Sequence, residues 1–362
     1  MDLTKGWMRY LIPGFIFQSV VIGGGYGTGA EIAQFFGVSG MKGGLLGLLV
    51  TMVVWGIVCA ITFEFCRVFK TFDYGSMMQK LLGPVAYLYD LTYYLMMFIV
   101  LGVVNATASA MMDKMIPGAG WAGIAILSGG SIFLVFKGTK MIENVLAFWS
   151  YVLYAVYVVF VIGVYTKFGD AIANSFATGT VGSDWLSNGF VYSFYNLVVV
   201  PLILYSVADF ETRKEAVVSG LLAGAIGVIP GILLHLAMGC DLENVVKAAV
   251  PVGVVFDKLD MRWLYVTFQV VLFGTLIETE TGFVKAFTDR VENFMKQRGK
   301  EMNSTNYISM VLGVVLVGIG ISAFGLLNLI AKGYGTACWL FLILYAVPMC
   351  TLGVYKVMQH KE

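Results

Sequence analysis

The chain has 362 residues, of which 59% are hydrophobic and only 12% charged, and its mean hydropathy is +0.84. A soluble domain carries about 25% charged residues, so this composition excludes an ordinary water-soluble globular protein. The formal net charge of +1 offers no attraction for nucleic acid. The composition therefore predicts an integral membrane protein surrounded by the lipid bilayer.

The ends of the chain and its cysteines add little chemistry. The first apolar segment is too long for a cleavable signal, and no A-x-A site follows it. The cysteines show no CxxC spacing and the two histidines are far apart, so we expect no disulfide framework, resident metal or cofactor. No nucleophile–base set or phosphate loop is visible, which argues against an enzyme. These residues are Cys59, Cys66, Cys240, Cys338, Cys350, His235 and His360.

Apolar windows of about 20 residues predict an all-α polytopic membrane protein in one integral membrane domain, 1–362. The ten predicted spans lie near 9–36, 44–66, 86–112, 120–137, 141–166, 187–208, 217–239, 262–284, 306–323 and 335–357. Three further segments are too short or too charged to cross. We expect 242–260 to form a helical hairpin or interfacial piece, 324–334 a short surface helix, and 285–304 a charged cytoplasmic extension of the eighth span.

Basic residues set the orientation. With a cytoplasmic N-terminus, most of the 23 lysines and arginines lie on the inner side, as the positive-inside rule requires. We therefore expect both termini in the cytoplasm and the protein in the cell membrane. The sequence does not indicate an oligomeric state.

The first span contains an unusual interior. Ile12–Gly37 is long enough to cross a bilayer, yet Gly23, Gly24, Gly25, Tyr26 and Gly27 occupy its middle. Each glycine costs a helix about 1 kcal/mol relative to alanine. Directly afterwards, Thr28 and Glu31 have the S/T-x-x-E form of a capping box. We predict two half-helices, about 12–22 and 28–36, joined by unwound backbone that lines a cavity.

The sixth span is predicted to break at a corresponding place. A Gly-Leu-Leu match relates Gly44 in the second span to Gly220 in the seventh, and the same offset moves the first break onto 199–203, which contains Pro201. Proline removes a backbone donor and disrupts the preceding turn. Five spans separate the halves, so they run in opposite directions. This predicts a 5+5 inverted repeat, 9–166 and 187–357, with a site between the two breaks.

The GGGYGTGAEIAQFF stretch at Gly23–Phe36, the ten-span count and the late LIAKGYG segment resemble the YkvI-like family of amino-acid permeases. That family is placed in the amino acid–polyamine–organocation superfamily, whose members have the leucine-transporter fold. The resemblance covers essentially the whole chain and implies a permease, without naming its cargo.

The backbone of the Gly23–Gly27 break is the foremost candidate site. Free N–H groups at the start of the second half-helix suit an anion such as a carboxylate, and carbonyls left by the first half suit a cation. The alternative is tight helix packing through small residues. Glu31 has two possible roles. It can complete the capping box with Thr28, and it can recognise a substrate ammonium group or a coupling ion. The two roles are compatible.

The eighth span carries Thr275, Glu278, Thr279 and Glu280. The resemblance implies that this span supplies oxygen ligands to a sodium ion shared with the first break, and hard cations prefer such ligands. A coupling ion, Na⁺ or H⁺, is therefore expected here. The alternative is a structural role near the cytoplasmic end.

Tyr195 and Asn196 precede the sixth-span break, and Asn105 lies on the third span. Aromatic faces with a few polar tips typically line a small-ligand pocket, although helix–helix hydrogen bonding also explains an intramembrane asparagine. Two functions stay open at this point. One is a cation-coupled secondary transporter of an amino acid or related small amine, and the other is a membrane-embedded sensor of such a ligand. A sensor needs a signalling partner, and the chain shows no large soluble domain for one.

Overall fold

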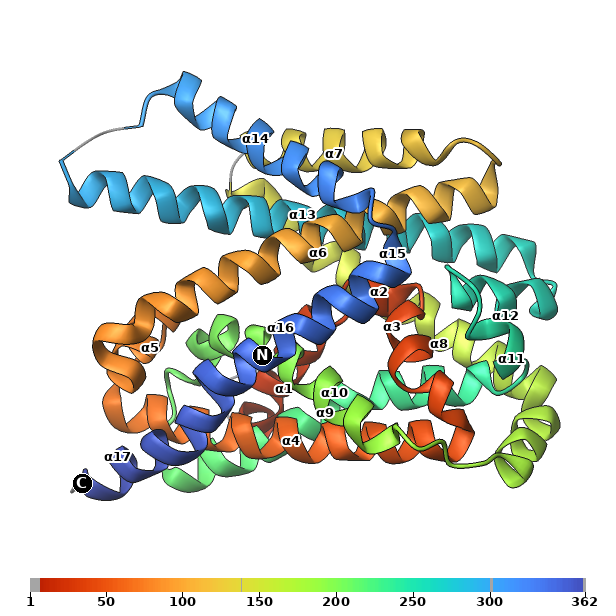
Figure 1. Cartoon of the computed structure of the whole chain (residues 1–362), viewed down its shortest axis with the longest axis horizontal. Coiled ribbons are helices and arrows are strands. Elements are labelled where there is room, and N and C mark those ends of the chain that lie inside the picture. The colour runs from red at the N-terminus through yellow and green to blue at the C-terminus, as the bar shows by residue number, and fades with distance from the viewer. Residues whose placement is uncertain (1–6, 138, 300–301, 361–362) are drawn as a thin grey trace.

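The computed structural model describes residues 7–137, 139–299 and 302–360. Within these ranges the chain forms helices joined by short turns, with no β-strand. Long helices run roughly side by side along the longest axis, and the N-terminal segments α1 to α3 lie among them (Figure 1).

The principal α-helices are α1 (Met8–Val21), α2 (Gly24–Gly27), α3 (Ala30–Phe35), α4 (Gly40–Phe69), α5 (Tyr74–Leu82), α6 (Ala86–Met115), α7 (Gly120–Lys137), α8 (Thr139–Thr178), α9 (Trp185–Asn196), α10 (Arg213–Met238), α11 (Leu242–Val245), α12 (Pro251–Leu259), α13 (Arg262–Gln297) and α14 (Ser304–Ser322). A 3₁₀-helix, η3 (Leu197–Val207), follows α9. The last run comprises α15 (Leu326–Asn328), η4 (Leu329–Tyr334), α16 (Gly335–Phe341), η5 (Leu342–Ala346), η6 (Met349–Gly353) and α17 (Val354–Gln359).

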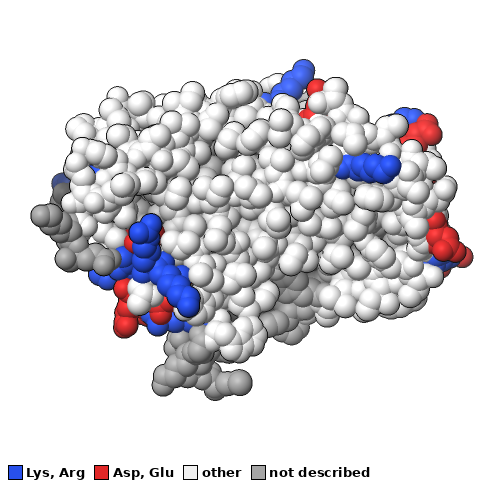
Figure 2. Space-filling view, turned by 90° about the horizontal axis from the view of Figure 1, so that it is seen from below, with Lys and Arg blue, Asp and Glu red and all other residues white. Residues whose placement is uncertain are grey.

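The outer surface suits lipid. Eight helical stretches in the described residues are long and apolar enough to cross a membrane. The two predicted spans outside this set are 9–36, which is divided at its break, and 262–284 in α13. Figure 2 shows one face that is largely free of charge over its middle, with Lys, Arg, Asp and Glu gathered mainly toward the two ends. Apolar side chains such as Val53 of α4, Leu91 of α6 and Leu316 of α14 are exposed on the molecular surface. The protein is therefore an all-helical membrane protein.

The first span is interrupted as predicted. Helix α1 ends at Val21, α2 makes a single turn, and α3 begins only at Ala30. The sixth span changes helix type instead of unwinding. Proline's ring clashes with the carbonyl four residues earlier, which for Pro201 is Leu197, and η3 begins at that residue.

For the remaining segments, the structure overturns one expectation, adds one helix that was not expected and confirms one short helical pair. The segment 324–334 is not a separate surface helix. From Leu326 it is the first part of a helical run that continues to Gln359 through three π-helical stretches, η4, η5 and η6, and Leu329, Ile330 and Tyr334 are buried. The amphipathic helix α5 was not predicted. Helices α11 and α12 form the short helical pair expected at 242–260.

Helices α4 and α10 pack closely along their lengths. The contact depends on Gly220 and Gly224 of α10. A Cβ atom at Gly220 would meet the backbone of Ala60, and one at Gly224 would meet backbone atoms of Gly56 and Met52. Small residues let helix backbones approach closely where no hydrophobic force drives association. Gly220, the glycine of the Gly-Leu-Leu match, is therefore a packing residue.

We predict that Gly224→Ala destabilises the protein by about 1–3 kcal/mol, the usual range for overpacking, because the new methyl group meets backbone atoms that cannot turn aside. The matched control is Gly313→Ala in α14, where a Cβ meets nothing within 4 Å. Thermal unfolding of the detergent-purified variants measures the difference. Equal midpoints for the two variants would contradict this account of the α4–α10 contact.

Candidate functional site

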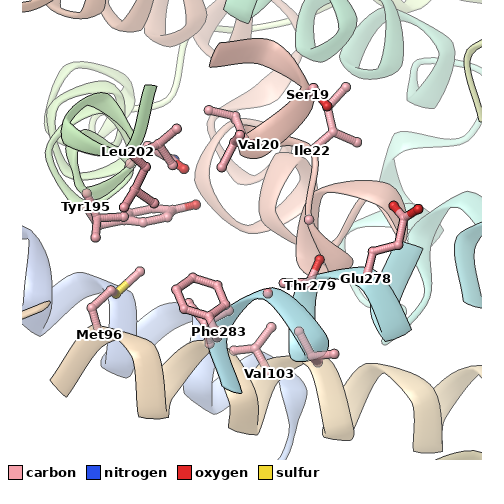
Figure 3. Close-up of a pocket in the computed structure, with 18 of the residues that line it drawn as sticks. Ser19, Val20, Ile22, Met96, Val103, Tyr195, Leu202, Glu278, Thr279 and Phe283 are labelled. Carbon is pink, nitrogen blue, oxygen red and sulfur yellow. The ribbon is translucent and has the colours of Figure 1, made fainter. Parts of the chain in front are cut away.

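A cavity of about 380 Å³ lies where the break in the first span meets the sixth span. Five parts of the chain supply its wall: the end of α1, Glu31 of α3, helix α6, the α9–η3 junction, and helix α13, with Tyr334 of η4 beside them (Figure 3). The lining residues used below are Ser19, Val20, Val21, Ile22, Gly23, Glu31, Tyr93, Met96, Val100, Val103, Tyr195, Asn196, Thr275, Glu278, Thr279, Phe283 and Tyr334.

The break itself consists of two turns. At Ile22 the backbone adopts φ −73° and ψ 77°, and the N–H of Gly23 donates to Val21 O at 2.8 Å, the geometry of an inverse γ-turn. Helix α2 then closes one turn through the N–H of Gly27, which donates to Gly23 O at 2.8 Å. Gly29 has φ +78°, in the left-handed region that favours glycine. Two changes of backbone direction therefore separate α1 from α3.

The predicted capping box at Thr28 and Glu31 is wrong. The left-handed Gly29 is the residue before α3, so Glu31 is the second helical residue and not the third, the position that a capping box requires. The Thr28 hydroxyl donates to Gly25 O at 3.1 Å. Glu31 is released from the cap and turns toward the cavity.

Glu31 links the first span to the sixth. Its Oε2 accepts a hydrogen bond from the Tyr195 hydroxyl at 2.5 Å, and only 5% of the residue is exposed. Its other carboxylate oxygen lies against Gly25, where any Cβ atom would collide with it. The glycine therefore makes room for the carboxyl group, and the tyrosine fixes its direction.

Aromatic rings form the wall beside Glu31. The rings of Tyr195 and Tyr334 stack with centroids 4.5 Å apart and planes at 22°, and Phe35 packs on Tyr195 at 5.6 Å. A carboxyl group next to stacked aromatic faces is suited to an organic cation, because the cation is attracted both by the carboxylate charge and by the faces of the rings.

One face of α13 closes the opposite side. Thr275, Glu278 and Thr279 line the cavity together with backbone of Val20 to Gly23, and Figure 3 shows Thr279 and Glu278 on the same side as Ser19 and Ile22. The hydroxyls of Thr275 and Thr279 donate to their own helix, to Val271 O at 3.2 Å and Thr275 O at 2.9 Å. Their oxygen lone pairs stay available to a cation.

No model of a protein family matches the chain. It is 22% identical over 320 residues to YkvI of Bacillus subtilis (strain 168), described as an uncharacterised membrane protein, with 86% of this chain and 90% of YkvI covered. The predicted resemblance to YkvI is confirmed by this match.

Solved structures identify the fold. The manganese transporter of Eremococcus coleocola, solved with an aromatic bis-isothiourea compound, has a TM-score of 0.58 at 14% identity and covers 94% of this chain and 78% of its own. Mhp1, a nucleobase-cation-symport-1 family transporter solved in a closed conformation with bromovinylhydantoin bound, has a TM-score of 0.51 at 15% identity, covering 98% and 81%. The chain has a leucine-transporter-like fold.

Not every predicted site residue reaches the cavity of this leucine-transporter-like fold. Gly23, Glu31, Tyr195, Asn196, Thr275, Glu278 and Thr279 line it, whereas Gly25, Tyr26, Gly27, Thr28, Asn105 and Glu280 do not. Gly24 belongs to the backbone of α2. The Tyr26 hydroxyl lies near Gly231 of α10, and Gly27 packs against Leu272. The Asn105 amide donates to Leu101 O at 2.9 Å within α6.

Several wall residues were missed from the sequence. Tyr334 was assigned to a surface helix, so its aromatic ring was not considered. On α6 the cavity face is the strip with Tyr93, Met96, Val100 and Val103, whose spacing by three and four residues marks one side of a helix. The polar Asn105 drew attention to the adjacent strip.

We predict that Tyr195→Phe lowers the free energy of unfolding by about 1–3 kcal/mol, because the buried Glu31 carboxyl group loses its hydrogen-bond donor. Tyr89→Phe is the matched control, since Tyr89 is equally buried and its hydroxyl has no hydrogen-bond partner among the described residues. Thermal unfolding of both variants in detergent decides the matter. A Tyr89→Phe loss as large as that of Tyr195→Phe would show that the Glu31 contact contributes nothing.

Proposed function

We propose that this protein is a secondary active transporter that moves an amino acid or a related small amine across the cell membrane by alternating access, coupled to Na⁺ or H⁺. The observation that carries the proposal is the single cavity shared by the interrupted first span and the α9–η3 junction, with the Glu31 carboxyl group bridging them. Interrupted helices that meet at one site are typical of transporters.

The charge of the cavity supports a substrate with an ammonium group. Two carboxyl groups, Glu31 and Glu278, stand in the wall, and no Lys, Arg or His is among the lining residues in the described part of the chain. A positive substrate would be attracted by the carboxyl groups and by the faces of Tyr195 and Tyr334. The cavity's volume of about 380 Å³ is within the usual range for small-molecule sites.

The same wall argues for an organic cargo over a transition metal. One structural neighbour is a manganese transporter, but the described residues of this chain contain no group of three or more His, Cys, Asp and Glu that could hold a metal ion. Transition-metal sites combine several such ligands. The stacked aromatic rings instead favour an organic molecule that buries apolar surface against them.

Helix α13 carries the residues proposed for the coupling ion, either the oxygen atoms in the cavity wall or the buried Glu280 carboxyl group on another strip of the helix. Thr275, Thr279 and Glu278 provide oxygen atoms opposite the carbonyl end of α1. Such a set suits Na⁺ as a hard cation, while a carboxyl group at membrane depth also suits a proton.

The proposed topology has ten membrane spans in a 5+5 inverted repeat, 9–166 and 187–357, with both termini cytoplasmic. The ten are the interrupted α1–α3, then α4, α6, α7, α8, α9 with η3, α10, α13, α14 and the run from α15 to α17. The close contact of α1 with η3, and of α4 with α10, supports it, because the first two helices of one half meet their counterparts in the other.

We predict that proteoliposomes containing the protein accumulate an amino acid or amine from a mixture when a sodium or a proton gradient is imposed separately. Glu31→Gln is expected to reduce the initial uptake rate by about tenfold, equivalent to 1.4 kcal/mol, because the ammonium group loses its counter-charge. Glu243→Gln, an exposed residue of α11 paired with Lys247 at 2.9 Å, is the matched control.

Counting radiolabelled substrate in the washed vesicles measures both variants. Binding without net uptake by the wild-type protein would favour a sensor on the same scaffold. Wild-type uptake by correctly folded Glu31→Gln would remove Glu31 from the substrate site.

A further inference from the structure

Two glutamates of α13 point to opposite sides of that helix. Glu278 lines the cavity with Thr275 and Thr279, but Glu280 does not and is 0% exposed. Successive residues of an α-helix are turned by about 100°, so residues two apart face nearly opposite directions. Glu280 therefore belongs to the interface of α13 with α6, α7 and α14, away from the cavity.

That interface is apolar on both sides of Glu280. One turn before it, Ile277 packs against Gly130 of α7. One turn after it, Val284 joins a buried cluster with side chains from α6, α7 and α14. The cluster consists of Val284, Leu101, Val135, Val311, Val314 and Val315.

The polar groups that the structure describes near the Glu280 carboxyl group are uncharged. The Asn105 amide approaches it while donating to Leu101 O at 2.9 Å, and Asn105 Oδ1 accepts from Ser128 Oγ at 3.4 Å. Neither carboxylate oxygen of Glu280 receives a hydrogen bond of normal geometry from the described residues. Ser131, one turn along α7 from Ser128, is also fully buried without a partner there.

Among the side chains that the structure describes, no charged group faces Glu280 from the elements packed against α13; the side chains of 139–151 of α8, which include Lys140 and Glu143, lie outside the described set. Residues 97–109 of α6, 120–136 of α7, 152–166 of α8 and all of α2 and α14 contain no Asp, Glu, Lys, Arg or His. The titratable groups of those stretches are tyrosines, namely Tyr26, Tyr154, Tyr157, Tyr165 and Tyr307. Charges at the ends are paired elsewhere: Lys114 with Asp257, Lys258 with Asp241, and Arg290 with Asp90. On α13 itself, Glu278 and Lys285 lie on other strips of the helix.

An ionised carboxylate in this position would be very costly. Burying an ion without a partner costs several kcal/mol, and a group so placed becomes neutral instead. A glutamate therefore destabilises this apolar interface relative to an apolar side chain. Ionisable groups of this kind inside membranes mark proton and ion pathways.

We propose that Glu280 is the proton-carrying residue of the transporter, so that the coupling ion is H⁺ and travels outside the substrate cavity. Its carboxyl group holds the proton while α13 is packed against α6, α7 and α14. When α13 shifts in the transport cycle, the carboxyl group releases its proton to water on one side of the membrane. The carboxylate then takes its next proton from water on the opposite side before α13 repacks. The inference rests on the proposed transport function.

The test uses the full-length protein in proteoliposomes without sodium, under an imposed gradient of about one pH unit. Such a gradient sustains about a tenfold substrate accumulation when one proton accompanies each substrate, since tenfold corresponds to about 1.4 kcal/mol. We expect this accumulation for the wild-type protein and for Glu292→Gln. Glu292 is the matched control on the same helix, where it pairs with Lys296 at 2.8 Å near the C-terminal end.

Glu280→Gln is expected to equilibrate substrate without accumulating it, while exchange of labelled for unlabelled substrate continues. The amide keeps the shape of a neutral carboxyl group but cannot release a proton. Proton-driven accumulation by Glu280→Gln overturns the proposal, as does wild-type accumulation that follows sodium and ignores the proton gradient. Loss of exchange together with accumulation in folded Glu280→Gln overturns it as well, because the residue would then serve binding or structure.

A second measurement keeps the test decisive if Glu280→Gln does not fold. The infrared spectrum of the wild-type protein should contain the C=O stretch of a buried protonated carboxyl group, and Glu280→Asp should shift that band. An unshifted spectrum overturns the proposal. If the wild-type protein transports nothing at all, the proposed function fails instead, and the infrared comparison still decides whether Glu280 holds a proton.

Discussion

The structure depends on how peptide groups inside a membrane find hydrogen-bond partners. In lipid, each unsatisfied N–H or C=O group costs several kcal/mol, so a helix cannot stop at membrane depth unless other groups replace its lost bonds. At this break the replacements are local and specific. Gly23 donates to Val21 O, the Thr28 hydroxyl donates to Gly25 O, and Thr28 O accepts from the N–H of Val252 in α12 at 3.0 Å. The interruption is a built feature, and it opens the cavity.

The hydrogen bond between Glu31 and Tyr195 turns the break into a contact between two distant parts of the chain. Tyr195 in turn stacks on Tyr334, which the π-helical start of the last run brings to the cavity. Three segments therefore converge on one carboxyl group. In the proposed transport cycle, the first span moves relative to the sixth, and the Glu31–Tyr195 hydrogen bond then either breaks or moves with both spans. A substrate that competes with Tyr195 for Glu31 would therefore influence that movement directly.

The sequence predicted an all-helical membrane protein, most of its apolar helices and the first break, because composition and local propensity determine these features. It failed where the outcome depends on register or on distant contacts. The pattern T-x-x-E occurs at Thr28 and again at Thr212, but only Thr212 forms the capping box with Glu215. Thr212 has extended backbone, whereas the left-handed Gly29 shifts the start of α3 by one residue. Likewise, nothing local marks Tyr334 as a cavity residue, since its position depends on the π-helical turns of η4 and their packing on α9.

Helix α13 shows why a cluster of polar residues in a sequence does not amount to one site. Thr275, Glu278, Thr279 and Glu280 all looked like ligands of one ion, yet on the helix Glu280 is turned by about 160° from Glu278 and about 100° from Thr279. One face of α13 meets the cavity and the other meets α6, α7 and α14. Because both faces belong to one rigid element, a displacement that alters the cavity also alters the surroundings of Glu280. A proton bound on one face of α13 and a substrate bound at the other can then change each other's binding affinity without direct contact. Such coupling between two sites is the physical requirement for transporting a proton and a substrate together.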